Sequence, residues 1–168
     1  MQAGLDFELT VAEIFNFAKL SPSGPVPWET DSTETNAGVY VVARVCDINA
    51  DCEGALRFKD LCGIELDWEN ERQRWLPNEP IVYVGKTDRP IRKRLREFHR
   101  HKCGNKSPHA GGQVVKLLCC DLWVYWAPSA DPYGVEQMMI RAFKNQAGQP
   151  PFANQLPGQN TRRIRRSN

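Results

Sequence analysis

The sequence has no apolar run long enough to cross a bilayer, and its first residues, MQAGLDFELT, lack the basic start and continuous apolar stretch of a signal peptide. Both absences argue against membrane and secreted classes, so we expect a soluble, cytoplasmic protein without a membrane partner. With 168 residues, of which 41% are hydrophobic, the chain suits one compact domain with decorations and is too short for two full cores.

Pairs of the Cys-x-x-Cys type are also absent, although the chain has six cysteines. Five Trp and seven Phe can form a core without disulfides, so we expect reduced thiols. One tight cluster, His99, His101 and Cys103 with His109 nearby, leaves a zinc site open as an alternative.

Acidic residues are scarce in one segment, between Lys86 and Lys106. Nine Lys and Arg stand there against two acids, a formal charge of +7 in a chain whose net charge is only +2. Residues 1–44 and 45–80 carry −4 and −5, and the residues from Pro157 onward carry +4. A basic segment between acidic segments is typical of a protein that binds phosphate groups on one limited part of its surface.

This basic segment predicts a strand, a glycine turn and a helix. The β-branched and aromatic run Ile81 to Val84 stops at Gly85, after which a proline can open the helix. Ile91, Leu95 and Phe98 then recur at helical spacing and form one apolar face. A solvated helix face is the alternative interpretation of the cations between them. These cations are Arg94 and four residues that we expect to bind DNA, which are Arg92, Lys93, Arg96 and Arg100.

Caps, turns and β-branched runs predict the other elements. They are a helix at 10–20 with a Thr10–Glu13 capping box, an extended proline-rich connector at 21–28, strands at 39–45 and 122–126, a short helix near 114–118, and a helix at 131–144.

The chain therefore divides into three parts. Residues 1–36 form an N-terminal helix and connector, residues 37–156 form the main domain, and residues 157–168 form a basic tail. An acidic insertion at 46–80 is expected to be packed down by Trp68 and Trp75, and its charge argues against contact with DNA. An inhibitory or partner-binding role for it stays open. The tail should be flexible and should neutralise phosphates through Arg162, Arg163, Arg165 and Arg166.

Glu136 occupies an unusual place on the last helix. Ile140 and Phe143 lie four and seven residues beyond it, so all three share a face within about 40°. A carboxylate on an apolar face is unfavourable unless a cation, a metal or strong donors compensate it. We therefore expect a functional role, with an ion pair to a helix arginine as the alternative.

Five elements in order then complete a pattern: Gly38-Val39-Tyr40, Tyr83-Val84-Gly85-Lys86, Arg94, Glu136 and Asn154. This pattern resembles the GIY-YIG nuclease superfamily over residues 38–154. The insertion between the two tyrosine motifs and the adjacent Cys119 and Cys120 look most like the GIY-YIG type II restriction endonucleases. The resemblance implies an α+β fold, with a small antiparallel sheet of about three strands flanked by helices.

The resemblance also implies a DNA endonuclease that hydrolyses phosphodiesters with one divalent ion, Mg²⁺ or Mn²⁺. Tyr40 and Tyr83 would line the site, and Lys86 would hold a tyrosine or the attacking water in its reactive state. Arg94 would bind the scissile phosphate, Glu136 would hold the metal and Asn154 would secure the floor of the site. Hydrolysis needs a base, and neighbouring Lys and Arg charges should lower a tyrosine pKa toward that use.

One departure concerns the position four residues after Arg94, where many members of the superfamily have Tyr or His and this chain has Phe98. Phe98 cannot exchange protons. His99 follows directly and is our candidate substitute, while His101 lies nearly two helical turns beyond Arg94.

Two other functions stay open. The first is a nucleic-acid binding module that keeps the fold and has lost turnover, which Phe98 favours. The second is a repair or mobile-element nuclease that nicks one strand. A restriction enzyme that cuts a palindrome needs two active sites, for which a homodimer is the usual arrangement.

Overall fold

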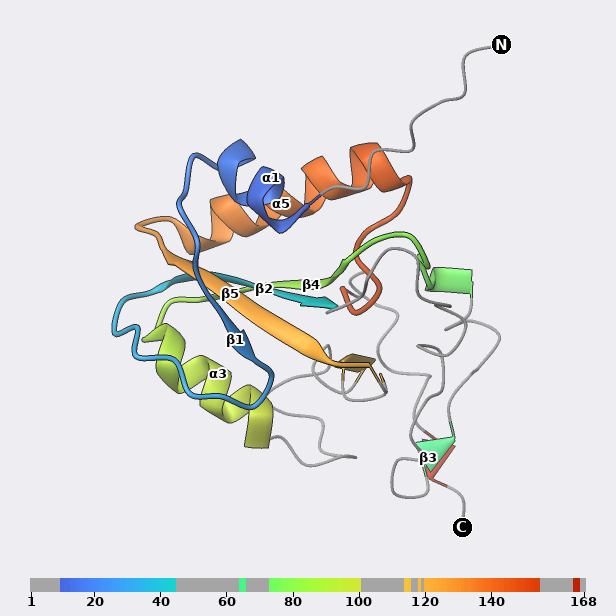
Figure 1. Ribbon diagram of the computed structural model, residues 1–168, viewed down its shortest axis with the longest axis horizontal. Helices are drawn as coiled ribbons and strands as arrows, with labels where there is room; N and C mark the ends of the chain where they lie inside the picture. The colour runs from blue at the N-terminus through green and yellow to red at the C-terminus, as the bar shows by residue number, and fades with distance from the viewer. Residues whose placement is uncertain are drawn as a thin grey trace.

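The computed structural model describes residues 10–44, 64–65, 73–100, 114–115, 118, 120–154 and 165–166, with backbone alone at 64–65 and 165–166. The fold is α+β, as expected: an antiparallel four-stranded sheet in the order β1-β5-β2-β4 with helices on both faces (Figure 1). Its strands are β1 (Ser23–Pro27), β2 (Gly38–Arg44), β4 (Ile81–Thr87) and β5 (Leu122–Pro128). The helices are α1 (Val11–Phe17), α3 (Ile91–Arg100) and α5 (Pro132–Ala147).

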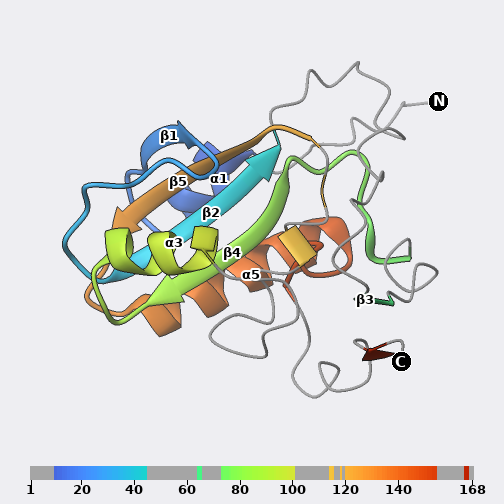
Figure 2. The ribbon, with the colours of Figure 1, turned by 90° about the horizontal axis from the view of Figure 1, so that it is seen from below.

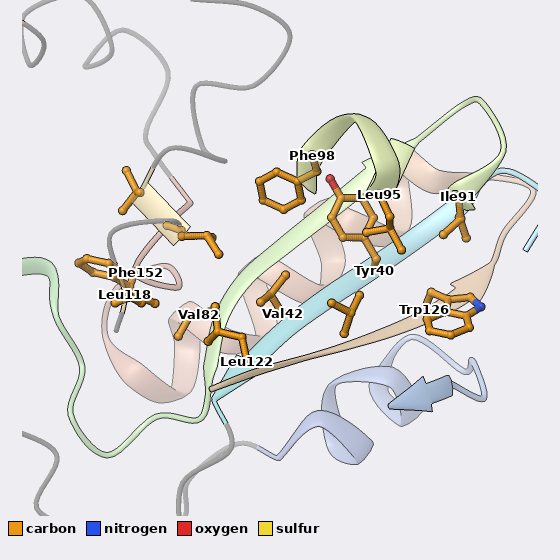
Figure 3. Packing of buried hydrophobic residues seen from close by; sticks show 14 of the residues in the cluster. Tyr40, Val42, Val82, Ile91, Leu95, Phe98, Leu118, Leu122, Trp126 and Phe152 are labelled. Carbon is orange, nitrogen blue, oxygen red and sulfur yellow. The ribbon is translucent and has the colours of Figure 1, made fainter. Parts of the chain in front are cut away.

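Alternation along β2 assigns its side chains to two cores. Tyr40 and Val42 join the core beneath α3, whereas Val39 and Val41 join the core beneath α1 and α5. Figure 1 shows α1 and α5 on one side of the sheet and α3 on the other. In the core beneath α3, Tyr40 lies close to Leu95 and Phe98 (Figure 3).

The fourth strand, β1, comes from the segment predicted to be a proline-rich connector. It pairs with β5 at Val26↔Val124 and Pro27↔Trp123. β1 is an edge strand. An edge strand tolerates proline where the missing N–H would point away from the neighbouring strand. The extended backbone was therefore predictable, but its pairing was not.

The caps and the apolar face predicted for the helices agree closely with the structure. Thr10 and Glu13 form the predicted capping box of α1, although the helix ends at Phe17 rather than near Leu20. Asp131 caps α5 by accepting a hydrogen bond from the Gly134 amide at 3.0 Å. α3 buries the three residues predicted to form its apolar face, which are Ile91, Leu95 and Phe98.

The end of the insertion packs against the sheet, and Trp75 is buried there as expected. The Arg44 guanidinium donates to the carbonyl oxygen of Pro77 at 2.6 Å and lies over the Trp75 ring at 4.9 Å. Trp75 meets Phe152 edge to face, with ring centroids 5.1 Å apart. Trp68 lies outside the described residues.

A second, two-stranded sheet joins the insertion to the tail. The backbone of β3 (Ile64–Glu65) pairs antiparallel with β6 (Arg165–Arg166). Among the helices described here, none has the length and apolar character needed to span a bilayer.

Gly85 does not end β4, which corrects the predicted glycine turn. The strand continues to Thr87, and Gly85 lies directly opposite Tyr40 in the ladder. A Cβ on residue 85 would meet Tyr40 Cζ and would lie 2.6 Å from Tyr40 Oη and 2.7 Å from Tyr83 Cε1. The glycine is needed because the buried Tyr40 ring occupies the space of a side chain.

We predict that Gly85→Ala destabilises the fold by about 1–3 kcal/mol, the usual range for overpacking a core. The penalty should shrink in a Tyr40→Leu background, because leucine has no Cζ or hydroxyl at that point. Urea unfolding of the single and double variants measures this coupling.

Gly148→Ala provides the control for the glycine experiment. Nothing lies within 4 Å of a Cβ there, and the φ of 82° makes the penalty purely conformational. That penalty should be equal in both backgrounds. If Gly85→Ala also costs the same in both, contact with Tyr40 is not the reason for the glycine.

Candidate active site

The site residues predicted from sequence gather around the C-terminal half of β4, an edge strand, near the starts of α3 and α5. Figure 2 shows β4 between these two helices. On the α3 side, the rings of Tyr40 and Tyr83 have centroids 5.9 Å apart and are tilted by 46°. Phe98 packs on both, at 6.1 Å and 5.5 Å.

Arg94 brings a positive charge to the two tyrosines from the first turns of α3. It is half-buried, and its charge acts on the hydroxyls of Tyr40 and Tyr83. Tyr40 Oη and Arg94 Nε are both buried, and side-chain hydrogen bonding with Arg94 and Tyr83 lowers the pKa of Tyr40. The phenol and the guanidinium are therefore coupled in a buried environment, where polar interactions are stronger than in water.

The tyrosine pKa values shift opposite to our expectation. Burial raises the pKa of Tyr40, and the charge of Arg94 offsets that effect only in part. Burial raises the pKa of Tyr83 well above its usual value, and the nearby Tyr40 and Glu136 raise it further. Both phenols are therefore protonated at neutral pH, because the loss of hydration outweighs the neighbouring cation.

Lys86 lies on the other side of β4, where it faces α5, the helix that carries Glu136. Lys86 is opposite Val39 in the ladder, and its ammonium lies over the Tyr133 ring, 5.3 Å from the centroid. Burial raises the pKa of Glu136, while the Lys86 charge, a hydrogen bond from Gln137 and the Arg94 charge lower it. Lys86 therefore acts on the pKa of Glu136. The charges that act on the tyrosine pKa values come from Arg94 and Glu136 and, for Tyr83, also from Tyr40.

Glu136 links the two sides of the strand. Its charge raises the pKa of Tyr40 and of Tyr83 on the α3 side, and Arg94 in turn lowers the pKa of Glu136. Charges act on one another more strongly in a partly buried environment than in water. The four side chains thus form one electrostatic cluster across the edge of the sheet.

Asn154 completes the outer edge of β4. Its Oδ1 accepts from the Val84 amide at 2.9 Å, and its Nδ2 donates to the Val84 carbonyl oxygen at 2.8 Å. Ala153 adds a backbone bond to the Val82 carbonyl oxygen at 2.8 Å. The asparagine side chain substitutes for a neighbouring strand between the two tyrosine-motif positions 83 and 85, which agrees with a floor role.

His99 is directed away from this cluster. Its ring meets Trp28 edge to face at 4.6 Å, and its Nε2 accepts from the Glu29 amide at 3.3 Å. Phe98 lies between Trp28, at 4.8 Å, and the tyrosine pair. The structure therefore places an apolar ring where a proton-exchanging group was sought, and His101 lies outside the described residues.

The cations proposed to bind DNA have mixed surroundings. Arg92, Lys93 and Arg100 are exposed on α3. Arg96 forms an ion pair with Asp31 at 3.2 Å, which is exposed and hence worth less than about 1 kcal/mol. Arg162 and Arg163 lie outside the described residues, and only the backbone of Arg165 and Arg166 is described.

Within the cluster, the Glu136 carboxylate is the side chain that could hold a divalent ion. Among the described residues, its carboxylate receives one hydrogen bond, from Gln137 Nε2 at 3.4 Å, and forms none of the ion pairs considered as the alternative. No group of three His, Cys, Asp or Glu side chains suited to a metal occurs in that part of the chain. A single half-buried carboxylate fits Mg²⁺ or Mn²⁺ that keeps most of its water ligands, and does not fit an all-protein cage.

Two contributors were not predicted from sequence. Tyr133, one helical turn before Glu136, contacts Lys86, and that spacing could have indicated it. Arg74 donates from Nη2 to the carbonyl oxygens of Phe152 at 2.7 Å and Asn154 at 2.9 Å, and so holds the segment that carries Asn154. Arg74 lies in the acidic insertion, where no sequence signal linked it to the site.

Comparison with known proteins gives no relative: no protein-family model matches the chain, and no curated protein or solved structure was found to be similar to it.

We predict that Asn154→Asp destabilises the protein at pH 7 by about 1–3 kcal/mol, as much as Asn154→Ala does. An ionised carboxylate accepts from the Val84 amide but cannot donate to the Val84 carbonyl. A protonated carboxyl group can donate, so the folded state should raise the pKa of the introduced carboxyl group. The deficit relative to wild type should therefore shrink as the pH falls through the raised folded-state pKa toward about 4, and should stay constant below about 4.

Denaturant unfolding at pH 3.5 and pH 7 tests this, with Asn145→Asp as control. Asn145 is exposed on α5, so its change should stay within about 0.5 kcal/mol at both pH values. An Asn154→Asp variant as stable as wild type at pH 7 would show that the Nδ2 bond contributes nothing.

Proposed function

We propose that the protein is a metal-dependent DNA endonuclease of GIY-YIG type that acts in the cytoplasm and cuts both strands as restriction enzymes do. One observation carries the proposal: two phenols, an arginine and a single carboxylate share one electrostatic cluster at the edge of β4, with a lysine beside the carboxylate. The exposed cations of α3 supply a surface for the DNA backbone next to it.

The chemistry follows from these groups. Arg94 binds the nonbridging oxygens of the scissile phosphate and stabilises the charge that grows there in the transition state. Tyr83, the partly exposed member of the tyrosine pair, holds the attacking water. The phenolate form of Tyr83 or Tyr40 takes the proton as the new phosphorus–oxygen bond forms and the bond to the leaving oxygen breaks. The positive charge of Lys86 favours the ionised form of Glu136.

Glu136 would hold the divalent ion. Such an ion supplies Lewis-acid stabilisation of the oxygen that leaves. Gln137, the hydrogen-bond donor next to it, orients the carboxylate.

A second function, DNA binding without turnover, has one observation in its favour. Phe98 fills the space between the tyrosine pair and Trp28, so no side chain at this position can exchange a proton. Binding would persist because the α3 cations do not depend on Phe98.

A cleavage assay separates the two functions. With supercoiled plasmid and Mg²⁺ or Mn²⁺, the wild-type protein should produce linear DNA, and sequencing of the ends gives the site and the strand symmetry. Glu136→Gln should lower the single-turnover rate at least about 1,000-fold, because it removes the charge that holds the metal. EDTA should abolish cleavage by the wild-type protein.

Glu97→Gln is the matched control for Glu136→Gln. It removes one carboxylate from α3, where Glu97 pairs with Arg89 at 2.6 Å, and should leave cleavage intact.

Salt-dependent DNA binding without any product would support the binding module instead. Nicked circles as the final product would favour a one-strand nuclease. Undiminished cleavage by Glu136→Gln refutes the metal role.

The raised tyrosine pKa values predict a particular pH dependence. If a phenolate accepts the water proton, its population grows tenfold per pH unit below its pKa, so the single-turnover rate should rise from about pH 6.5 to about pH 9.5 without a plateau. Tyr40→Phe and Tyr83→Phe identify the acceptor, since the correct variant loses the rate at every pH. A plateau below about pH 8.5, or full activity of both variants, contradicts the assignment.

A further inference from the structure

Tyr133 is an exposed aromatic residue one helical turn before Glu136 on α5. Its exposed fraction is 61%, in contrast to Met139 and Phe143, which anchor the same helix in the core. The core therefore does not require an aromatic ring at position 133. The residue lies three positions before Glu136, which places both on the same face of α5, one turn apart.

The ring of Tyr133 contacts the Lys86 ammonium. Lys86 Nζ lies 5.3 Å from the ring centroid, within the range at which the negative face of an aromatic ring attracts a cation. A lysine side chain has four rotatable bonds, and fixing their rotation costs conformational entropy. An isolated surface lysine therefore samples many positions. Contact with the Tyr133 ring reduces the number of positions that the Lys86 ammonium samples.

The position of Lys86 matters because its charge acts on Glu136. Of the groups that favour the ionised carboxylate, Lys86 contributes most, ahead of Gln137 and Arg94. Lys86 also comes from β4 while Glu136 and Tyr133 come from α5, so the contact joins the strand to the helix on the side opposite the tyrosines.

We propose that Tyr133 is a positioning residue, whose ring holds the Lys86 ammonium beside the Glu136 carboxylate and so keeps the two halves of the site in register. The expected effect on catalysis rests on the proposed function, whereas the effect on Lys86 does not.

The test compares Tyr133→Phe, which keeps the ring, with Tyr133→Leu, which keeps apolar bulk without a ring. In NMR spectra of the protein, the Lys86 methylene protons next to Nζ should show an upfield ring-current shift in wild type and Tyr133→Phe. That shift should vanish in Tyr133→Leu. Met138→Ala, a change at another exposed apolar residue of α5, should leave the shift in place.

Single-turnover DNA cleavage gives the second measurement. Tyr133→Leu should lower the rate about 3- to 30-fold with little change in DNA binding, and Tyr133→Phe should stay within about twofold of wild type. In a Lys86→Met background, Tyr133→Leu should cause no further loss, because the two residues act through one contact.

The outcomes separate this proposal from the function it rests on. An unchanged Lys86 shift in Tyr133→Leu overturns the positioning role whether or not the protein cuts DNA. Equal rate losses in Tyr133→Phe and Tyr133→Leu also overturn it, since the hydroxyl and not the ring would then matter. Absence of cleavage by wild type overturns the nuclease proposal, while the NMR comparison still decides the role of Tyr133.

Discussion

Burial of the Tyr40 ring against the backbone of Gly85 is the constraint on which the rest of the structure depends. The ring is fully buried between the central strand β2 and helix α3, and it occupies space that any side chain at position 85 would need. The contact fits the register in which Tyr40 lies opposite Gly85, and in that register Tyr40 lies beside Tyr83. It also removes water from the phenols, and so determines their protonation.

The edge position of β4 explains how residues from both faces of a sheet reach one site. Side chains of a central strand point to opposite faces and are separated by neighbouring strands, whereas those of an edge strand can meet around its open side. A bare edge invites pairing with another chain. In this protein, the Asn154 amide occupies the hydrogen-bonding groups of Val84 and leaves the side chains at 83 and 86 accessible to the two helices.

The cluster combines groups that are unfavourable in a folded protein. The Tyr40 hydroxyl and the Arg94 guanidinium share a buried environment, and Glu136 is a carboxylate whose pKa is raised by burial. Such an arrangement reduces stability and persists where binding or catalysis requires it. The surrounding hydrogen bonds of Asn154 and Arg74 and the packing of Phe98 and Trp75 compensate for it.

Much of the fold was predictable because the signals are local. The caps at Thr10 and Asp131 and the apolar spacing of Ile91, Leu95 and Phe98 each depend on residues within a few positions of one another. The sequence alone also indicated Tyr40, Tyr83, Arg94 and Glu136, which the fold brings into one cluster. Tertiary structure decided the pairing of β1, the passage of β4 through Gly85, the direction of Lys86 toward α5 and the ring contact of Tyr133. It also reversed the expected shift of the tyrosine pKa values, because the charge of Arg94 can be read from the chain but the loss of hydration depends on segments brought together from far apart.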